Sequence, residues 1–529
     1  MAKLTIDGRE VKVAAGTNLI EAARAAGVAV PYFCYHPYLT VVGQCRICMV
    51  EIEGQPRLAI ACATPAVEGM VVKSETSERV REARTAVMEF LLANHPLDCP
   101  VCDQAGECLL QDHSFDEGSD FTHMAETRRT FPGYERRLIG PHVIQNQNRC
   151  IHCSRCIRFT EEISGTAQLT YKRRGNSAFI DTFAGRPFDD PMSGCAADVC
   201  PVGALTVRAF RFRKRAWRLR STPSICPGCS IGCNLWLDHH ERVAYRFTPR
   251  ENPAINATWL CDHGRFLADS LNDHAVLHPT RREAGAERRL SWPETLRSVA
   301  KELAAARTVR VVASANLSNE ALFLARRLFV EQLRAELVVP VWEGDGRRMK
   351  NGRGEWRHST DAHPNAAGAR RLGLRTADAE GISRFLNGAA DVTVVLDPLA
   401  HPFLAGAEAL QLLRVGATLV CGRTDHRANG VARWLLPTAS LACDEGTFTS
   451  STGAVQRFAP AFAPPGETRP LWHILALLGR ELGGAHAAVA TVADAFTAMV
   501  GADVDFAGLD WDALAPAAAE PIREHTHVG

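Results

Sequence analysis

The sequence predicts a multidomain protein in which α+β modules are followed by an α/β region. The chain has 529 residues, of which 46% are apolar, enough for three to five units at roughly 100–200 residues per domain. Its 18 cysteines are unevenly placed, because all but two lie before residue 262. Beyond that point, apolar stretches at 309–313, 392–396 and 417–421 alternate with helical segments rich in arginine and leucine. This alternation is typical of α/β layering.

The first 27 residues predict two paired strands and a helix. Apolar residues alternate on both sides of Asp7-Gly8, and an Asp-Gly pair in that setting is a strong hairpin signal. A helix is expected to begin after Asn18, which has Glu21 three residues on, and to end at Gly27. Strand, strand and helix therefore precede the first cysteines.

Charge and hydropathy exclude several classes of protein. The net charge is +1 and charged residues make up 22%, which argues against a nucleic-acid binder or an acidic disordered chain. The N-terminus lacks the features of a secretory signal, and no run approaches the ~20 apolar residues of a membrane span. We expect a cytoplasmic chain without a direct membrane span. Its cysteines would then bind metal rather than form disulfides.

Fifteen cysteines and one histidine fall into four sets of four, each with its own spacing. We name each set by its first residue. The Cys34 site is Cys34, Cys45, Cys48 and Cys62; the His95 site is His95, Cys99, Cys102 and Cys108; the Cys150 site is Cys150, Cys153, Cys156 and Cys200; the Cys226 site is Cys226, Cys229, Cys233 and Cys261. Cys195, Cys421 and Cys443 remain, and we expect them to be small packed thiols.

The Cys34 site has the spacing C-x10-C-x2-C-x13-C. Four thiolates are the soft ligands that iron-sulfur clusters require, and Gly43 would let the backbone approach the cluster. The pattern resembles a plant-type 2Fe-2S ferredoxin. Its first loop is longer than the plant spacing and is similar to that of respiratory and hydrogenase subunits. A zinc ribbon is the alternative, since zinc also takes four cysteines.

The His95 site is C-terminal to a helical pattern and lies in the string HPLDCPVCDQAGECLLQD. A histidine at a helix end is more often a cap or a surface residue, but three cysteines follow this one closely. An imidazole in place of a thiolate removes one negative charge from a cluster. That exchange should raise the reduction potential, as it does in Rieske centres.

The Cys150 site combines the close triplet CIHCSRC with a remote Cys200-Pro201 pair. This matches the bacterial ferredoxin pattern for a 4Fe-4S cluster. Only one such triplet lies in this stretch, so a single cluster closed by Cys200 is the economical interpretation. Cys195 lacks a following proline and is not expected to be a ligand.

The Cys226 site reads C-x2-C-x3-C-x27-C and resembles the N-terminal cluster domain of molybdopterin oxidoreductases. Between it and the preceding site, residues 208–220 carry seven arginines or lysines together with three aromatic residues. A nucleic-acid interface is one interpretation of such a stretch. We favour a linker whose cations offset the charge of nearby clusters or meet an acidic partner, with no nucleic-acid partner.

The order and sequences of these motifs, over residues 1–275, resemble those of the large iron-sulfur subunit of NADH-quinone oxidoreductase, respiratory complex I. The resemblance implies one 2Fe-2S cluster at the Cys34 site and 4Fe-4S clusters at the other three. The chain departs from the family at Ser193-Gly194-Cys195, where an asparagine commonly follows the glycine. The expected domains are a 2Fe-2S ferredoxin-like domain at 1–80, a His/Cys3 4Fe-4S module at 81–120, a ferredoxin-like 4Fe-4S domain at 141–210, a molybdopterin-oxidoreductase-type 4Fe-4S domain at 219–275 and a related α/β domain at 276–529.

The second half resembles the molybdopterin oxidoreductase fold more weakly, through DAHPNAAGARRLG from Asp361 and CDEGTFTSSTGAVQ from Cys443. No molybdopterin is expected there. Formate dehydrogenases of this type resemble one another in having a catalytic cysteine or selenocysteine well after the last cluster. No cysteine lies between Cys261 and Cys421, so this metal ligand is not expected here. The 268 residues after Cys261 are also few for enclosing two pterin nucleotides.

By this resemblance the chain relays single electrons from an NADH- and flavin-binding subunit toward quinone-side iron-sulfur subunits. It would sit peripherally on the cytoplasmic side of a bacterial inner membrane, with no catalytic acid, base or nucleophile of its own. Arg46, Arg149, Arg155 and Arg158 are candidate charge neighbours of the clusters. The alternatives are the iron-sulfur subunit of an NAD-linked formate dehydrogenase or bidirectional hydrogenase, and a scaffold whose clusters only fold the chain.

Overall fold

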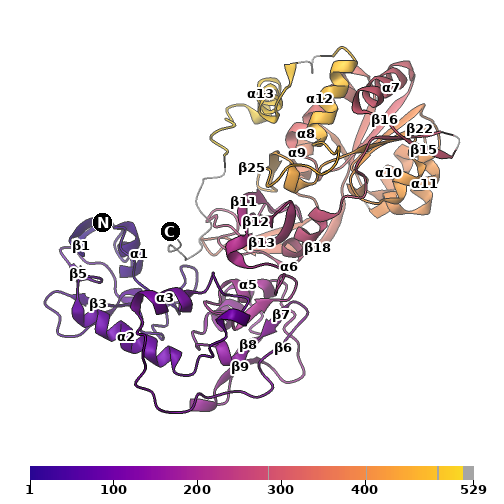
Figure 1. Ribbon diagram of the computed structural model, residues 1–529. Coiled ribbons are helices and arrows are strands. Elements are labelled where there is room, and N and C mark those ends of the chain that lie inside the picture. Colours follow the sequence, from indigo (N-terminus) through magenta and orange to yellow (C-terminus); the bar gives the residue numbers. More distant parts are fainter. Residues whose placement is uncertain (284, 401, 485–487, 516–529) are drawn as a thin grey trace. The chain divides into compact units, whose positions relative to one another are not determined.

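A computed structural model describes residues 1–283, 285–400, 402–484 and 488–515. The described residues form two compact units, 1–219 and 220–515 (Figure 1). The predicted combination of α+β modules with an α/β region is confirmed, because small sheets make up the first unit and a large, mostly parallel sheet dominates the second. The five-part division expected from the sequence is finer than these two units and stays a prediction.

The N-terminal module of the first unit is a five-stranded sheet in the order β2-β1-β5-β3-β4. Its strands are β1 Ala2–Ile6, β2 Arg9–Val13, β3 Met49–Ile52, β4 Ala59–Ile60 and β5 Val71–Lys73. The predicted hairpin is confirmed, since β1 and β2 pair antiparallel around Asp7 and Gly8, both at positive φ. Helix α1, Leu19–Ala25, begins as expected, because the Asn18 side chain accepts a hydrogen bond from the Glu21 N–H.

The rest of the first unit consists of short elements joined by long loops. Its helices are α2 Glu78–Leu92, α3 Leu109–Glu117, α4 Arg155–Arg158 and α5 Ser193–Asp198, and a π-helix spans Phe159–Ser164. Two small sheets accompany them. One is β10-β7-β6, from Leu205–Val207, Val143–Gln145 and Arg137–Leu138; the other pairs β8 Leu169–Lys172 with β9 Phe179–Thr182.

The second unit opens with a three-stranded antiparallel sheet of β11 Arg220–Ile225, β12 Asn234–His240 and β13 Val243–Pro249. Helix α6, Asp262–Arg265, follows it. Two hairpins occur later, β18 Glu343–Lys350 with β19 Trp356–Asp361 and β24 Gly446–Thr449 with β25 Val455–Phe458.

An eight-stranded sheet is the centre of the second unit, in the order β15-β14-β23-β22-β21-β16-β17-β20. Its strands are β14 Thr280–Glu283, β15 Ala286–Arg289, β16 Val309–Ala313, β17 Glu336–Pro340, β20 Arg375–Ala377, β21 Val392–Leu396, β22 Ala417–Gly422 and β23 Trp434–Pro437. The strands from β23 to β20 pair parallel, and β14 and β15 pair antiparallel at one edge. The predicted α/β layering is therefore confirmed, and the three predicted strands are β16, β21 and β22.

Helices cover both faces of this sheet (Figure 1). They are α7 Trp292–Ala305, α8 Asn319–Ala325, α9 Ala366–Arg371, α10 Ala379–Leu386, α11 Ala407–Leu413, α12 Leu471–Glu481 and α13 Val492–Ala502. Val311 and Val394 pack into a core with α7, α8, α9, α12 and α13, whereas Val312 and Val395 pack into a second core with α10 and α11. Alternate residues of a strand point to opposite faces, so a strand buried on both faces reads as a continuous apolar run.

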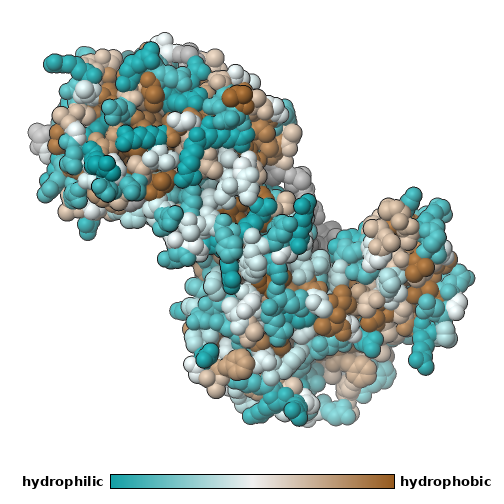
Figure 2. Space-filling view, turned by 180° about the vertical axis from the view of Figure 1, so that it is seen from behind, coloured by the Kyte–Doolittle hydropathy of each residue, from teal (hydrophilic) through white to brown (hydrophobic). Residues whose placement is uncertain are grey.

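The surface of the protein is mixed in character. Hydrophilic residues are distributed over the face shown in Figure 2, with scattered apolar residues between them. Within the ranges that the structure describes, none of the helices has the length and hydropathy needed to cross a bilayer.

A buried carboxyl group in the second unit sets a pH-dependent contribution to stability. Glu320 of α8 is fully buried, and its carboxyl accepts hydrogen bonds from the backbone N–H and the hydroxyl of Thr447 at 2.9 and 2.7 Å. Burial raises the pKa of Glu320 from 4.5 to about 7. Burial also raises the pKa of Asp444, nearby, to about 7.

We predict that Glu320→Gln flattens the pH dependence of unfolding of the second unit. Between the unfolded pKa of 4.5 and the folded pKa of about 7, the folded carboxyl holds a proton that the unfolded one has lost. Stability therefore falls as pH rises through this window. The measurement is urea unfolding at about pH 5 and about pH 8, followed by tryptophan fluorescence, because every tryptophan except Trp217 lies in the second unit.

The matched control is Glu481→Gln, because Glu481 is exposed at the end of α12. This variant should keep the wild-type loss of stability between the two pH values. Asp444 titrates in the same window, so Glu320→Gln should reduce the loss without abolishing it. A wild-type pH dependence in Glu320→Gln would contradict the prediction.

Candidate iron-sulfur cluster sites

The four cysteines of the Cys34 site lie in two pairs. Cys34 and Cys45 belong to the loop between α1 and β3, and each backbone N–H donates to the other's sulfur, at 3.5 and 3.4 Å. This close contact lowers the pKa of Cys34 to about 5, and contact with Cys48 likewise lowers the pKa of Cys62. A 2Fe-2S cluster has two irons, each with two protein ligands, so two thiol pairs fit that cluster.

The loop of this site approaches β4 closely at Gly43. Gly43 has a φ of +58°, and a Cβ at this position would lie 2.7 Å from Cδ1 of Ile60. Both the positive φ and the short distance disfavour any other residue. The close approach in the structure is to Ile60, and the expected approach of this backbone to a cluster stays a prediction. Arg46, also at positive φ, is exposed.

The His95 site is built between the end of α2 and the start of α3. Cys108 is the N-cap residue of α3, and Cys99 begins a 3-10 turn. Nδ1 of His95 is buried, and it has no hydrogen-bond partner among the residues that the structure describes. Burial lowers the pKa of His95 to about 4, so the ring is neutral at physiological pH. A neutral imidazole is the form that binds metals.

Burial also disfavours free thiolates at this site. It raises the pKa of Cys108 to about 12 and raises that of Cys102 as well. A buried thiol loses its proton readily only when a metal takes the proton's place. A neutral buried imidazole beside buried thiols therefore fits a metal-bearing group held by one histidine and three cysteines.

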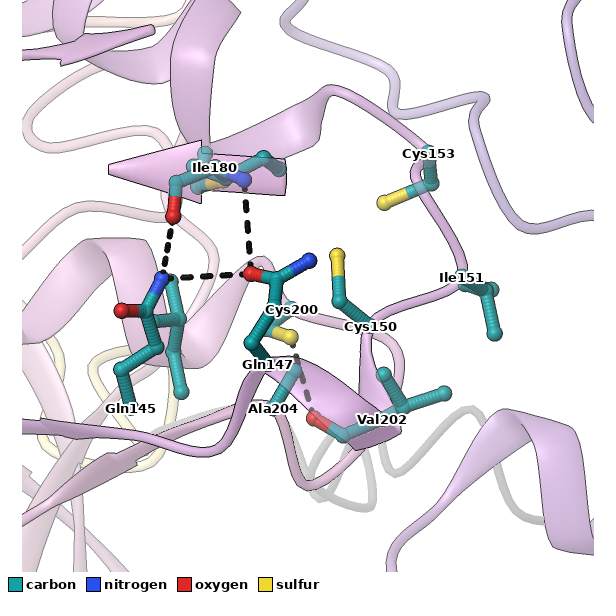
Figure 3. A pocket seen from close by; sticks show the side chains of 11 residues that line it. Gln145, Gln147, Cys150, Ile151, Cys153, Ile180, Cys200, Val202 and Ala204 are labelled. Carbon is teal, nitrogen blue, oxygen red and sulfur yellow. Dashed lines mark hydrogen bonds between the residues drawn. The ribbon is translucent and has the colours of Figure 1, made fainter. Parts of the chain in front are cut away.

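The Cys150 site surrounds a cavity (Figure 3). All four cysteines line it, and apolar side chains supply most of the remaining wall: Ile151, Ile180, Val202, Ala204 and Leu205. Burial raises the pKa of Cys200 to about 11 and raises the pKa values of Cys150 and Cys156. Four thiols around an apolar space fit a 4Fe-4S cluster, which needs four thiolates in a dry environment.

The back wall of this cavity is fixed by two glutamines. The side chain of Gln145 donates to the Ile180 carbonyl at 2.6 Å and to the side-chain oxygen of Gln147 at 3.4 Å. The same Gln147 oxygen accepts from the Ile180 N–H at 3.3 Å (Figure 3). Sequence reasoning did not identify these glutamines, because their contact with Ile180 of β9 joins segments more than thirty residues apart.

The Cys226 site lies in the second unit, where β11 turns into β12. Three of its cysteines are buried, and Cys261 is the N-cap residue of α6. The Cys226 N–H donates to the Cys233 carbonyl at 2.8 Å. A Cβ on Gly264 would lie 2.5 Å from the Cys226 sulfur and 3.7 Å from the Cys261 sulfur. The remote cysteine is therefore beside the close triplet, as the sequence predicts.

The cysteines outside the four sets occupy packed positions. Cys195 is buried in α5, and Cys421 belongs to the core on one face of the large sheet. Cys443 accepts a weak hydrogen bond from the Ser440 hydroxyl at 3.9 Å. In the described ranges, no three His, Cys, Asp or Glu side chains converge tightly enough to hold a single metal ion. The ligands of a cluster are spread around a core of several atoms and do not need to meet at one point.

The Cys34 and Cys150 sites are in direct contact. The side chain of Gln44 donates to the His152 carbonyl at 2.7 Å, and the Tyr171 hydroxyl donates to the same carbonyl at 2.8 Å. Arg158 donates to the carbonyls of Cys34 and Cys153 at 2.5 and 3.3 Å. Backbone that carries ligands of one site is thus held against backbone that carries ligands of the other.

The Cys150 and His95 sites are in contact as well. Arg149 is buried and pairs with Asp98 at 2.8 Å, and the Leu109 N–H donates to the Pro201 carbonyl at 3.1 Å. A Cβ on Gly203 would lie only 2.3 Å from the sulfur of Cys102. The Cys150 site therefore shares contacts with both of the other sites in the first unit.

Part of the basic segment at 208–220 lies beside the His95 site. Arg215 donates to the carbonyls of Cys102 and Pro100 at 2.6 and 2.5 Å. The ring of Trp217 fills the space where Gly106 has no side chain, since a Cβ there would lie 2.5 Å from the indole. The interpretation of this segment as cations near a cluster agrees with these contacts. Its interpretation as a partner surface stays a prediction.

Four families of domain match the chain in order. Residues 1–77 match the 2Fe-2S iron-sulfur cluster binding domain, and residues 84–123 match the NADH-ubiquinone oxidoreductase-G iron-sulfur binding region. Residues 140–206 match the ferredoxin-like domain of NADH-quinone oxidoreductase subunit 3, and residues 219–273 match the molybdopterin oxidoreductase Fe4S4 domain. The fold and these matches define a protein with several iron-sulfur domains, of both the 2Fe-2S and the 4Fe-4S type.

Whole-chain comparisons give the more particular relationship. The chain is 41% identical over 300 residues to the mitochondrial NADH-ubiquinone oxidoreductase 78 kDa subunit of Candida albicans, a match that covers 56% of this chain and 41% of the relative. It is 39% identical over 328 residues to the G subunit of the NADH-quinone oxidoreductase of Rickettsia bellii, covering 62% of this chain and 48% of the relative. The predicted resemblance to the large iron-sulfur subunit of NADH-quinone oxidoreductase is confirmed.

The chain spans less than half the length of these two relatives. Among solved structures, a chain of the NAD+-reducing [NiFe]-hydrogenase in the H2-reduced state matches with 32% identity and a TM-score of 0.35, over 40% of this chain and 90% of that one. A TM-score this low supports no comparison of architecture.

We predict that Gly203→Ala disrupts the His95 site. The new methyl group would lie 2.3 Å from the Cys102 sulfur and 3.1 Å from Cβ of Gln104, so the cysteine must move. The variant should lose about four irons per chain, the content of one 4Fe-4S cluster. Iron analysis of anaerobically purified protein measures this loss. Gly501→Ala is the control, because nothing lies within 4 Å of the added atom; wild-type iron in Gly203→Ala would refute the prediction.

Proposed function

We propose that this chain is the iron-sulfur electron-transfer subunit of an NADH-quinone oxidoreductase. It would relay single electrons from an NADH- and flavin-binding subunit toward quinone-reducing subunits. The observation that carries the proposal is which sites are neighbours in the first unit. The Cys150 site is in contact with both the Cys34 site and the His95 site. Electron transfer over several steps needs neighbouring centres, and this arrangement makes the Cys150 site the middle one.

All sixteen residues of the four sets are assigned as cluster ligands in this proposal. One 2Fe-2S cluster would be held at the Cys34 site, and three 4Fe-4S clusters would be held at the His95, Cys150 and Cys226 sites. The clusters supply one-electron oxidation and reduction. The chain's own residues supply the rest: buried thiols, a neutral imidazole, apolar walls that exclude water and arginines that set the local charge.

The surface next to the His95 site supports exchange with another protein. Cys99 is the only exposed cysteine among the described residues. Leu97, Val101 and Trp217 near it are 82%, 61% and 57% exposed. An apolar patch of this kind, with Arg215 next to it, suits a partner that has apolar contacts and an acidic rim.

The proposed partners are other peripheral-arm subunits of complex I, including the NADH- and FMN-binding subunit and quinone-side iron-sulfur subunits. The relatives named as complex I subunits support this assignment. The proposed location is peripheral, on the cytoplasmic side of a bacterial inner membrane, reached through the complex.

The first test is low-temperature electron paramagnetic resonance with metal analysis on anaerobically purified chain reduced in steps. The proposal expects signals from one 2Fe-2S centre and up to three 4Fe-4S centres, with roughly fourteen irons per chain and no molybdenum. Stoichiometric molybdenum or tungsten would move the protein to the formate dehydrogenase class. Zinc without reducible iron would refute electron transfer.

A scaffold role makes a different prediction for Cys153→Ala. If the clusters serve electron transfer, the variant should block electron flow from NADH to quinone in the assembled complex while its partners still co-purify. If the clusters only fold the chain, electron flow should fall in proportion to the loss of assembly. Partner identity in the same purification separates complex I from a formate dehydrogenase or hydrogenase complex.

We predict that His95→Cys lowers the reduction potential of its centre. A fourth thiolate adds a negative charge, so the ratio of reduced to oxidised centre at a fixed potential should fall at least about tenfold, or ~59 mV for one electron. Stepwise reduction followed by electron paramagnetic resonance measures the change. Cys443→Ala is the matched control, since Cys443 lies in the other unit. An unchanged potential in His95→Cys would exclude His95 as a ligand.

A further inference from the structure

Arg158 is a buried cation at the junction of the Cys34 and Cys150 sites. It is the last residue of α4, is followed by the π-helix 159–164, and is only 5% exposed. Its guanidinium donates to the carbonyls of Cys34, Thr40 and Cys153, and its Nε donates to the Ser154 hydroxyl at 3.3 Å. Its position is therefore fixed by backbone from both ligand loops.

No carboxylate pairs with Arg158 within the part of the chain that the structure describes, since all of its contacts there are with carbonyls and one hydroxyl. A buried charge is costly unless an opposite charge lies nearby. Clusters held by four thiolates are anionic, so the two ligand sets that contact Arg158 are candidates for that opposite charge. The same guanidinium touches one ligand residue of each set.

We propose that Arg158 is the counter-ion shared by the clusters of the Cys34 and Cys150 sites, and that its charge raises the reduction potential of both. The inference rests on the proposed function and deepens it by naming one residue that acts on two centres. Adding an electron to an anionic cluster costs less beside a fixed cation, and the low-dielectric surroundings of a buried guanidinium strengthen this effect.

The other arginines near the ligands are placed differently. Arg155 is buried and donates to the carbonyls of Tyr35 and Val199, the sequence neighbours of Cys34 and Cys200. Arg149 pairs with Asp98. Arg46 follows Cys45 in the sequence and is exposed, so water and salt screen its charge. Arg158 donates to carbonyls of ligand residues from two sites.

The test replaces Arg158 in the full chain and measures both potentials by stepwise reduction with electron paramagnetic resonance. Arg158→Gln removes the charge, and Arg158→Lys keeps it while losing the planar fork of donors. In Arg158→Gln the ratio of reduced to oxidised form at a fixed potential should fall at least about tenfold at both centres, or ~59 mV for one electron. Arg158→Lys should recover most of this shift. Arg46→Gln, the matched exposed arginine, should change the ratio by less than about twofold.

A second pair of variants applies if Arg158→Gln does not accumulate as folded protein. Ser154 has a φ of +59°, a conformation that both aspartate and asparagine tolerate, and its hydroxyl accepts from Arg158. Ser154→Asp would neutralise the guanidinium, whereas Ser154→Asn has the same shape without charge. The aspartate variant alone should lower both potentials.

The outcomes separate this inference from the proposed function. Parallel shifts at both centres, restored by lysine and absent in the Ser154→Asn and Arg46→Gln variants, support a shared counter-ion. A shift at one centre only, equal shifts in Arg158→Lys and Arg158→Gln, or no shift in Ser154→Asp would overturn the inference while leaving the clusters in place. Absence of both centres from the wild-type chain would instead refute the proposed function.

Discussion

A thiolate buried away from water is stable only beside positive charge, and this requirement governs the first 261 residues. The ligand thiols are mostly buried, and burial raises the pKa of Cys102, Cys108, Cys150 and Cys156. Bound iron is the principal positive charge that could answer this need. Arginine side chains are a second source of positive charge, since the guanidinium groups of Arg149, Arg158 and Arg215 lie beside the ligand loops.

The two units differ in what stabilises their folded state. The large sheet of the second unit has a core on each face, and its central strands are mostly apolar. Such a unit can be stable without metal. The Cys34 module has a core of its own, but the remaining ligands of the first unit lie in loops between short elements. For those loops, metal binding and folding are expected to be coupled.

Local patterns were enough to predict much of this structure. The Asp7-Gly8 pair located the hairpin, and apolar runs located β16 and β21. Spacing grouped the candidate ligands into four sets, and that assignment stays a prediction. The contacts between sites could not be predicted, because they depend on where loops far apart in sequence meet. Arg46 and Arg158 show why burial could not be predicted here. Both lie close in sequence to cysteines of the four sets, yet Arg46 is exposed and Arg158 is buried between two sites. Nothing local to the sequence distinguishes them.

The contacts of Pro201 and Gly203 connect the His95 site to a much later segment of the chain. The Pro201 carbonyl accepts the first N–H of α3, and Gly203 lies against the Cys102 sulfur. The wall of the His95 site is therefore completed by residues that leave the ribosome about a hundred positions after His95 itself. The packing around the His95 site is incomplete until the loop that follows Cys200 has docked. Delivery of iron and sulfide to that set would then be a late event, even though its ligands are made early.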